Sequence, residues 1–222
     1  TDFVVGNMGT NTQYKCSVTE PLTTYAADFN NDGTIDPVMT RFIQGKAYPA
    51  HSRDELVEQM PNLNKRFLKY ADYGNATITD VFSKEQLDAA KKFFVYQTAS
   101  MIFINNKGIF TGKALPIEAQ FSCMNGLSFQ DYDGDGKKDL LLTGNFYPFR
   151  VQQGNNDANF GLLLRGNNKG DFKTGVHNET GLYIPVDARD MVVLKGRTGE
   201  QVIVSKNNGG VQVIRPLKVE RN

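Results

Sequence analysis

The sequence contains few of the residues from which catalytic and metal sites are often built. Among 222 residues there are two cysteines, two histidines and no tryptophan. Cys16 and Cys123 are too few for a disulfide scaffold or a thiolate zinc site, and they leave open either one disulfide or two buried free thiols. His51 and His177 lie in no nucleophile or metal motif, and we expect surface or helix-capping roles for both.

Net charge and long apolar runs are lacking as well. The 25 Lys and Arg residues nearly balance the 24 Asp and Glu residues, so there is no basic excess of the kind that binds nucleic acid or anionic membranes. No run approaches the roughly 18 apolar residues of a membrane-spanning helix. With 40% hydrophobic and 22% charged residues, the composition is that of a folded globular protein. Because the chain starts Thr-Asp-Phe without signal-peptide features, we expect a processed product or a piece of a longer protein.

Most of the chain is predicted to be β-structure. Short runs rich in Val, Ile, Phe, Tyr and Thr alternate with Gly, Asn and Asp turns, which is typical of a meander of short strands. Strands are predicted at residues 3–5, 23–27, 38–43, 100–104, 127–130, 140–143, 160–165, 191–194, 202–205 and 211–214.

The segment 52–98 has helix signals in place of strand alternation. Capping boxes, in which a Ser and a Glu or Gln three residues later satisfy backbone donors at a helix start, occur at 52–55 and 83–86. We therefore predict a helical insertion of three short helices. One apolar helix face is expected from Leu63, Phe67 and Tyr70.

Internal repeats indicate the architecture. Residues 100–110 and 161–172 share an apolar strand, an Asn-rich turn with Gly, and a Phe. A fainter copy of an acidic segment leading into an apolar strand is read at 187–194. The repeating unit is predicted to be a four-stranded blade.

The strongest signal is an acidic spacing that occurs twice, at residues 28–36 (loop 1) and 131–139 (loop 2), each time before an apolar strand. Oxygen ligands at positions 1, 3 and 5 converge on a hard cation when the chain coils tightly, Gly at position 6 permits the turn, and position 7 offers its backbone carbonyl. Position 9 is Asp in both loops and replaces the Glu that closes an EF-hand. The predicted calcium ligands are Asp28, Asn30, Asp32, Thr34 and Asp36 in loop 1, and Asp131, Asp133, Asp135, Lys137 and Asp139 in loop 2.

Grouped carboxylates are the reason to expect a metal. Like charges a few ångströms apart repel one another, and a bound cation removes that cost. Asp, Asn and Gly are also turn formers, but turn propensity does not explain the same spacing twice. Asn30 gives loop 1 one charge fewer, so loop 1 is expected to bind calcium more weakly than loop 2.

Catalytic alternatives are weaker. Glu118 with Asp187 and Arg189 could form an acid and base pair, although nothing in the sequence places them together. Ionisable groups gather at 46–55, which suits either a binding surface or a solvated helix start. The aromatic run at 145–149 suits blade packing or, if exposed, stacking on sugars.

The two acidic loops, the strand Asp139-Leu-Leu-Leu-Thr-Gly-Asn145 and the phrase at 161–172 resemble FG-GAP or VCBS repeats, the blades of integrin-like calcium-binding β-propellers. Over nearly its full length the chain is similar to the C-terminal repeat region of large secreted or cell-envelope proteins of Bacteroidetes-type bacteria that also carry an ASPIC/UnbV module, which is absent here. The phrases behind this similarity are Gly6-Asn-Met-Gly-Thr-Asn11, Arg53-Asp-Glu-Leu56, Pro116-Ile-Glu-Ala-Gln-Phe121 and Gly144-Asn-Phe-Tyr147.

The resemblance implies two Ca²⁺ ions at the ligands named above and no catalytic residue. It implies an extracytoplasmic module, periplasmic, cell-surface or secreted, that binds a protein or glycan partner. The alternative is a polysaccharide-active hydrolase or lyase with a cleft between insertion and blades.

The predicted fold is mainly β, a partial propeller of four-stranded blades with a small helical insertion. We divide it into a first blade region with loop 1 (1–51), the helical insertion (52–98) and further blades with loop 2 (99–222). Once the insertion is subtracted, the chain offers only about three or four blades, whereas a closed propeller needs at least four, so we predict a fragment of a larger propeller or an assembly in which strand edges pair between copies. Other blades of a parent chain, or a homo-oligomer, are therefore expected as partners, with neither nucleic acid nor membrane insertion.

Overall fold

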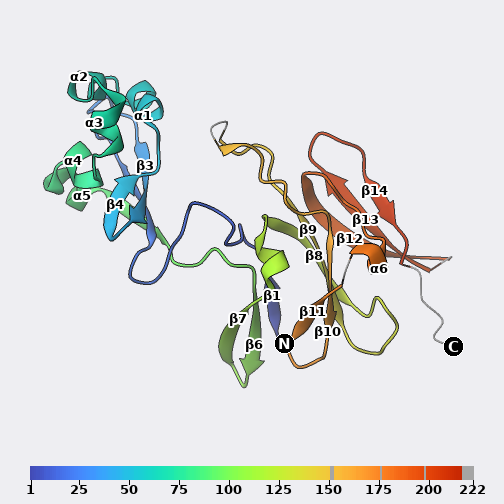
Figure 1. Cartoon of the computed structure of the whole chain (residues 1–222). Helices are drawn as coiled ribbons and strands as arrows, with labels where there is room; N and C mark the ends of the chain where they lie inside the picture. The colour runs from blue at the N-terminus through green and yellow to red at the C-terminus, as the bar shows by residue number, and fades with distance from the viewer. Residues whose placement is uncertain (151–152, 176, 198, 217–222) are drawn as a thin grey trace. The chain divides into compact units, whose positions relative to one another are not determined.

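The described part of the computed structural model, residues 1–150, 153–175, 177–197 and 199–216, is mainly β-structure in four antiparallel sheets (Figure 1). Sheet A has the strand order β1-β6-β7, sheet B β4-β3-β2-β5, sheet C β11-β10-β9-β8 and sheet D β12-β13-β14. The strands are β1 (Phe3–Val5), β2 (Leu22–Ala27), β3 (Asp36–Ile43), β4 (Lys46–Pro49), β5 (Lys91–Val95), β6 (Met101–Asn106), β7 (Ile109–Ala114), β8 (Met124–Gln130), β9 (Asp139–Gly144), β10 (Leu162–Gly166), β11 (Phe172–Thr174), β12 (Ala188–Gly196), β13 (Gly199–Lys206) and β14 (Gln212–Ile214).

Every strand predicted from the sequence is confirmed, with ends that move by a few residues. The strands that the sequence did not predict are β4, β5, β7 and β11. Along β5 and β7 all side chains are exposed, so neither strand has the alternation of buried and exposed residues on which the prediction relied. Both lie at the edge of a sheet.

The chain divides into two compact units. Unit 1 comprises Thr1–Thr12 and Ala99–Asn222, and unit 2 comprises Gln13–Thr98. Unit 2 is inserted between β1 and β6, which are nevertheless neighbours in sheet A, where Phe3 pairs with Phe103. Sheet B and the helices thus share one unit, whereas the expected segments 1–51 and 52–98 had separated them.

Unit 2 has a hydrophobic core of its own, formed between sheet B and the helices. The predicted capping boxes at Ser52 and Ser83 are both present, so both helices start where the sequence indicated. The three predicted helices are five shorter ones in the structure. They are α1 (Arg53–Gln59), α2 (Leu63–Arg66), α3 (Tyr70–Gly74), α4 (Ile78–Val81) and α5 (Lys84–Ala89).

The predicted apolar stripe is only partly correct. Leu63 and Phe67 are buried in the core of unit 2, but the Tyr70 side chain is 67% exposed. Helix α2 ends after a single turn, and the chain leaves the helical conformation before α3 begins at Tyr70. The helical phase that would have placed Tyr70 beside Phe67 is therefore lost.

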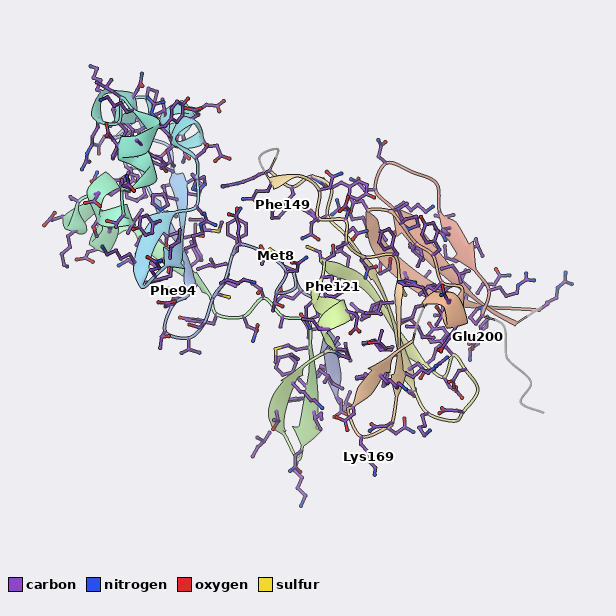
Figure 2. All side chains as sticks on the ribbon, viewed as in Figure 1. Met8, Phe94, Phe121, Phe149, Lys169 and Glu200 are labelled. Atoms are coloured by element: carbon purple, nitrogen blue, oxygen red, sulfur yellow. The ribbon has the colours of Figure 1, made fainter. Side chains whose placement is uncertain are left out.

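Unit 1 stacks three sheets face to face (Figure 2). One core cluster joins Ile102 of sheet A to Leu140 and Leu142 of sheet C. A second joins Leu141 of sheet C to Val204 of sheet D. Because neighbours along β9 point to opposite faces, sheet C is covered on both sides, which explains its continuous apolar sequence. The remaining elements of unit 1 are η1 (Ile117–Gln120) and α6 (His177–Thr180).

Both copies of the Asn-rich repeat are β-hairpins. Residues 100–110 fall on the β6–β7 hairpin and 161–172 on the β10–β11 hairpin. The fainter acidic copy at 187–194 does lead into a strand, β12, but β12 already starts at Ala188, so most of the acidic segment belongs to the strand. Only sheets B and C have four strands, and the described sheets are open, so propeller closure is not established. No helix in the described ranges is both long and apolar enough to cross a membrane.

Candidate metal centre

Loops 1 and 2 are the connections of two equivalent β-hairpins. Loop 1 joins β2 to β3, with Ala27 paired to Asp36, and loop 2 joins β8 to β9, with Gln130 paired to Asp139. The Asp at position 9 is therefore the first residue of the outgoing strand in both loops. Its backbone is fixed by the sheet, so the sheet positions one carboxylate of each loop.

Loop 2 is coiled around the carboxylate of its first residue. Asp131 Oδ1 accepts hydrogen bonds from the backbone N–H groups of Gly134 (2.7 Å) and Asp135 (3.2 Å), and Asp131 Oδ2 accepts one from Gly136 (3.0 Å). The N–H of Tyr132 donates to Asp139 Oδ2 (3.0 Å) and links the first turn of the loop to the outgoing strand.

Loop 1 has the same pattern at the equivalent positions. The N–H of Asp32 donates to Asp28 Oδ1 (3.0 Å), and that of Gly33 donates to Asp28 Oδ2 (2.8 Å). The N–H of Phe29 donates to Asp36 Oδ2 (3.0 Å). Two hairpins from different units thus share a loop conformation that their acidic spacing specifies.

Positive φ angles occur at the same places in both loops. Position 6 has φ of 88° at Gly33 and 80° at Gly136, and position 4 has φ of 60° at Asn31 and 76° at Gly134. Glycine and asparagine are the residues that adopt this left-handed region at least cost. The Gly at position 6 therefore serves the turn that the sequence pattern predicted.

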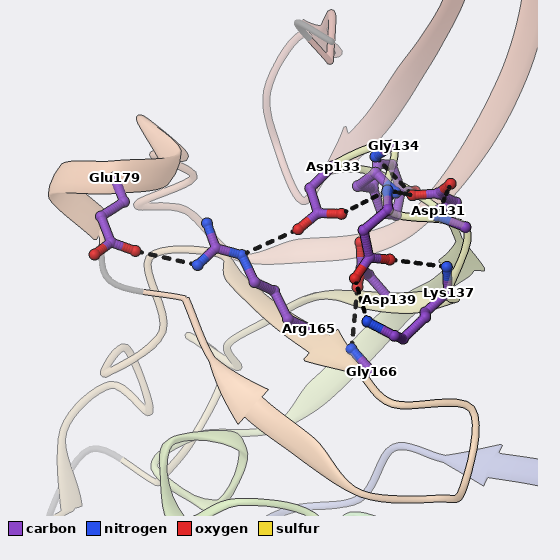
Figure 3. Close-up of polar contacts among 11 residues, drawn as sticks. Asp131, Asp133, Gly134, Lys137, Asp139, Arg165, Gly166 and Glu179 are labelled. Atoms are coloured by element: carbon purple, nitrogen blue, oxygen red, sulfur yellow. Dashed lines mark hydrogen bonds and ion pairs between the residues drawn. The ribbon is translucent and has the colours of Figure 1, made fainter. Parts of the chain in front are cut away.

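Three carboxylates come together in loop 2. Asp131, Asp133 and Asp139 each place one ligand oxygen within 4.8 Å of the others (Figure 3). Across the described ranges no other group of at least three His, Cys, Asp or Glu side chains comes as close. Of the predicted ligands in loop 2, Asp135 lies outside this group, and in loop 1 the three Asp carboxylates do not form such a group.

Two cationic side chains lie beside the loop 2 carboxylates. Lys137 Nζ is 2.7 Å from Asp135 Oδ2, and Arg165 Nε is 3.5 Å from Asp133 Oδ2. Arg165 comes from the end of β10 and also pairs with Glu179 on α6, at 3.2 Å (Figure 3). When Lys138 of the loop and Glu179 are included, five carboxylates against three cations leave a formal charge of −2.

Asp139 is the buried member of the site, with an exposed fraction of 1%. Burial raises the pKa of this carboxyl, and the charge of Asp133 raises it further, while hydrogen bonds from the N–H groups of Gly166 and Tyr132 act in the opposite direction. The hydrogen bond from Gly166 to Asp139 Oδ1 measures 3.0 Å. A nearby cation would favour the ionised form of Asp139.

Loop 1 satisfies its acidic side chains differently. Gln59 of α1 donates from Nε2 to Asp36 Oδ1 (3.1 Å), and Asn30 donates from Nδ2 to Asp32 Oδ2 (2.8 Å). The Thr34 hydroxyl also donates to Asp32, and hydrogen bonds from Thr34, followed by that from Asn30, lower the pKa of the Asp32 carboxyl. Neutral donors thus occupy positions where loop 2 has charged partners.

The donor set of each loop fits a hard divalent cation. All side-chain donors are carboxylate or amide oxygens, which suit calcium or magnesium rather than a soft metal. In loop 2 three of these oxygens already converge around an uncompensated charge of −2, so the residues present fit a calcium ion.

The alternative catalytic residues do not form a comparable site. Asp187 is 2% exposed, and its Oδ2 accepts from Arg189 Nη2 (2.7 Å) and Asn207 Nδ2 (3.0 Å). Glu118 lies on η1 and is half-buried. His177 Nδ1 lies 3.1 Å from the carbonyl of Leu182 on its own loop.

Both cysteines are free and half-buried, Cys16 in unit 2 and Cys123 in unit 1. Burial raises the pKa of both thiols. The structure thus has two free thiols, as one alternative predicted, but they are half-buried rather than buried.

The sequence reasoning missed the residues that contact the loops from outside. Arg165 and Asn168 reach loop 2 from the β10–β11 hairpin, where Asn168 Oδ1 accepts from the N–H of Lys138 (3.0 Å), and Gln59 reaches loop 1. These contacts depend on strand pairing and helix placement. The repeated Asn-rich turn was the one available signal, and it predicted a hairpin but not its contact with loop 2.

The chain matches no family model, no curated protein and no solved structure.

Proposed function

We propose that loops 1 and 2 each bind a calcium ion and that the protein is a calcium-stabilised FG-GAP/VCBS-type module of an extracytoplasmic protein. The observation that carries the proposal is the shared hydrogen-bonding pattern of the two loops, together with the convergence of Asp131, Asp133 and Asp139. A bound ion would clamp each loop and hold the outgoing strand in register. Millimolar calcium outside the cell would fill sites of modest affinity.

Calorimetric titration tests the metal proposal. We expect two calcium ions per chain, with the tighter site at loop 2. Asp131→Asn and Asp28→Asn, made separately, should each remove one site while the other stays. Asp72→Asn, a substitution of an exposed carboxylate on α3, is the matched control and should leave both. The proposal would be rejected if the unsubstituted chain gave no heat on titration with millimolar calcium. It would also be rejected if both loop variants gave the same heat as the unsubstituted chain.

We propose that a glycan or protein partner binds beside loop 2. A cleft of about 350 Å³ there is lined by residues of sheets A and C and by Lys138, which follows the predicted position 7. Phe129 in this cleft is an exposed aromatic ring, and rings of this kind stack on sugars or anchor protein partners. The polar lining residues are Asp2, Ser128, Lys138, Asn167, Asn168 and Asp171.

A screen of glycans against the calcium-loaded chain tests this part separately. Phe129→Ala should abolish binding without altering the calcium titration, because Phe129 is not a predicted ligand. Binding that survives Phe129→Ala would place the partner elsewhere. The alternative of a polysaccharide-active enzyme has no specific observation in its favour, since this cleft contains neither Glu118 nor Asp187.

A further inference from the structure

The three sheets of unit 1 are stacked in the order A–C–D, and the outer faces of the first and last sheets both carry apolar side chains. Sheet C packs one face on sheet A and the other on sheet D, so each of the two junctions joins neighbouring sheets through apolar side chains. Sheets A and D each use one face in these junctions. Their remaining faces are the two ends of the stack.

The outer face of sheet A carries aromatic side chains. Strand register places Phe3 opposite Phe103 and Phe103 opposite Gly112, in one row across the sheet. The Phe3 and Phe110 rings lie 5.2 Å apart, and their side chains are 51% and 45% exposed. A Cβ at Gly112 would lie 2.9 Å from the Phe103 ring, so the glycine leaves room for this ring beside β7.

The outer face of sheet D carries aliphatic side chains in the same kind of row. Val192 pairs with Ile203, and Ile203 pairs with Val213. Val192 and Val213 are 52% and 55% exposed, whereas Val202 and Val204, which point to the other face, are fully buried against sheet C. Sheet D is thus apolar on both faces, as expected of an inner layer rather than an outer one.

We infer that the outer face of sheet D docks on the outer face of sheet A of a second copy of this chain. The two outer faces can form one further junction that extends the sheet order A–C–D, and a single chain carries both of them. A junction between the outer face of sheet D (face D) and the outer face of sheet A (face A) continues the sheet order A–C–D from one copy into the next. A junction between two copies of face A would reverse that order. Two copies related by a twofold axis would form two such junctions and cover both apolar outer faces of each copy.

The mass of the intact 222-residue chain in solution tests the inference. Light scattering after size exclusion should give a dimer that dissociates on dilution. Phe110→Glu on face A and Val213→Lys on face D should each weaken the dimer at least about tenfold, because each places a charge in an apolar junction. Ile109→Glu is the matched control on the same strand, since its side chain points to the opposite face, and it should leave the mass unchanged.

Mixing the variants identifies the pairing of the faces. Phe110→Glu protein keeps face D and Val213→Lys protein keeps face A, so an equimolar mixture should form a heterodimer through one intact junction at concentrations at which neither variant dimerises alone. Unchanged melting temperatures establish that each variant is folded. A chain that is monomeric at all concentrations would overturn the inference, as would a dimer that Phe110→Glu disrupts and Val213→Lys does not.

Discussion

Loops 1 and 2 have the same backbone and differ in what neutralises their carboxylates. Each is a hairpin loop that wraps its first Asp with backbone N–H groups and ends on a buried Asp at the start of a strand. Loop 2 gathers three carboxylates and places Lys137 and Arg165 beside its acidic side chains, whereas Thr34, Asn30 and Gln59 satisfy loop 1 with neutral donors. The acidic spacing thus specifies the shape of the loop, and the residues around it set the electrostatics.

The largest expected effect comes from removing the buried Asp of each loop. Asp139→Ala would leave the N–H groups of Tyr132 and Gly166 without acceptors and should destabilise unit 1 by about 3 kcal/mol. Asp36→Ala should destabilise unit 2 by about 2 kcal/mol, because it leaves the N–H of Phe29 unpaired. Amide hydrogen exchange in chelator, read at Leu142 for unit 1 and Val38 for unit 2, measures each effect without calcium.

The two units have separate cores, so each substitution should act within its own unit. Asp72→Ala on the surface of α3 serves as the control. Equal loss of protection in both units from either variant would mean that the units unfold together.

Calcium removal should have the next largest effect. At a concentration one hundred times the Kd, a bound ion stabilises the folded state by about 2.7 kcal/mol. We expect chelation to lower the melting temperature of both units, and that of unit 1 more, because loop 2 is proposed as the tighter site. Sodium chloride at the same ionic strength as the calcium solution is the control. Identical melting curves in calcium and in chelator would count against a stabilising ion.

Asp135→Ala should weaken calcium binding more than Asp32→Ala. Loop 2 has four carboxylates against three in loop 1, so we expect it to be the tighter site with more affinity to lose, about tenfold at loop 2 and less at loop 1. In Asp135→Ala the charge of Lys137 is no longer balanced by Asp135 and would repel the ion, so titration at high salt, which screens this repulsion, is the control. Small and equal effects from both variants would mean that position 5 is not a ligand.

The smallest expected effect comes from exchanging the residues at position 7 of the two loops, Thr34 and Lys137. Lys137→Thr removes a cation paired with Asp135 and should strengthen calcium binding at loop 2 by about threefold, since exposed ion pairs are weak. Thr34→Lys should weaken loop 1 to a similar degree. Calorimetry at two salt concentrations should show both effects shrink at the higher one. A calcium affinity that is indifferent to both exchanges would exclude competition between the lysine and the ion.

The difference between the loops also indicates how far the sequence can be read. Local patterns predicted ten of the fourteen described strands, both capping boxes and both acidic loops, because backbone turns and caps depend on residues a few positions apart. Strand β5 and the pairing of Arg165 with Asp133 could not be predicted, because both depend on which distant strands become neighbours. The same holds for the place of Gln59 beside Asp36, which follows from how α1 packs in unit 2.

The most direct measurement is the backbone N–H resonance of Gly33 and of Gly136 during a calcium titration. Each N–H donates to the first Asp of its loop and therefore reports on that loop alone. We expect both resonances to shift and reach a plateau, with Gly136 doing so at the lower calcium concentration. If neither moves at millimolar calcium, the loops are acidic turns without an ion.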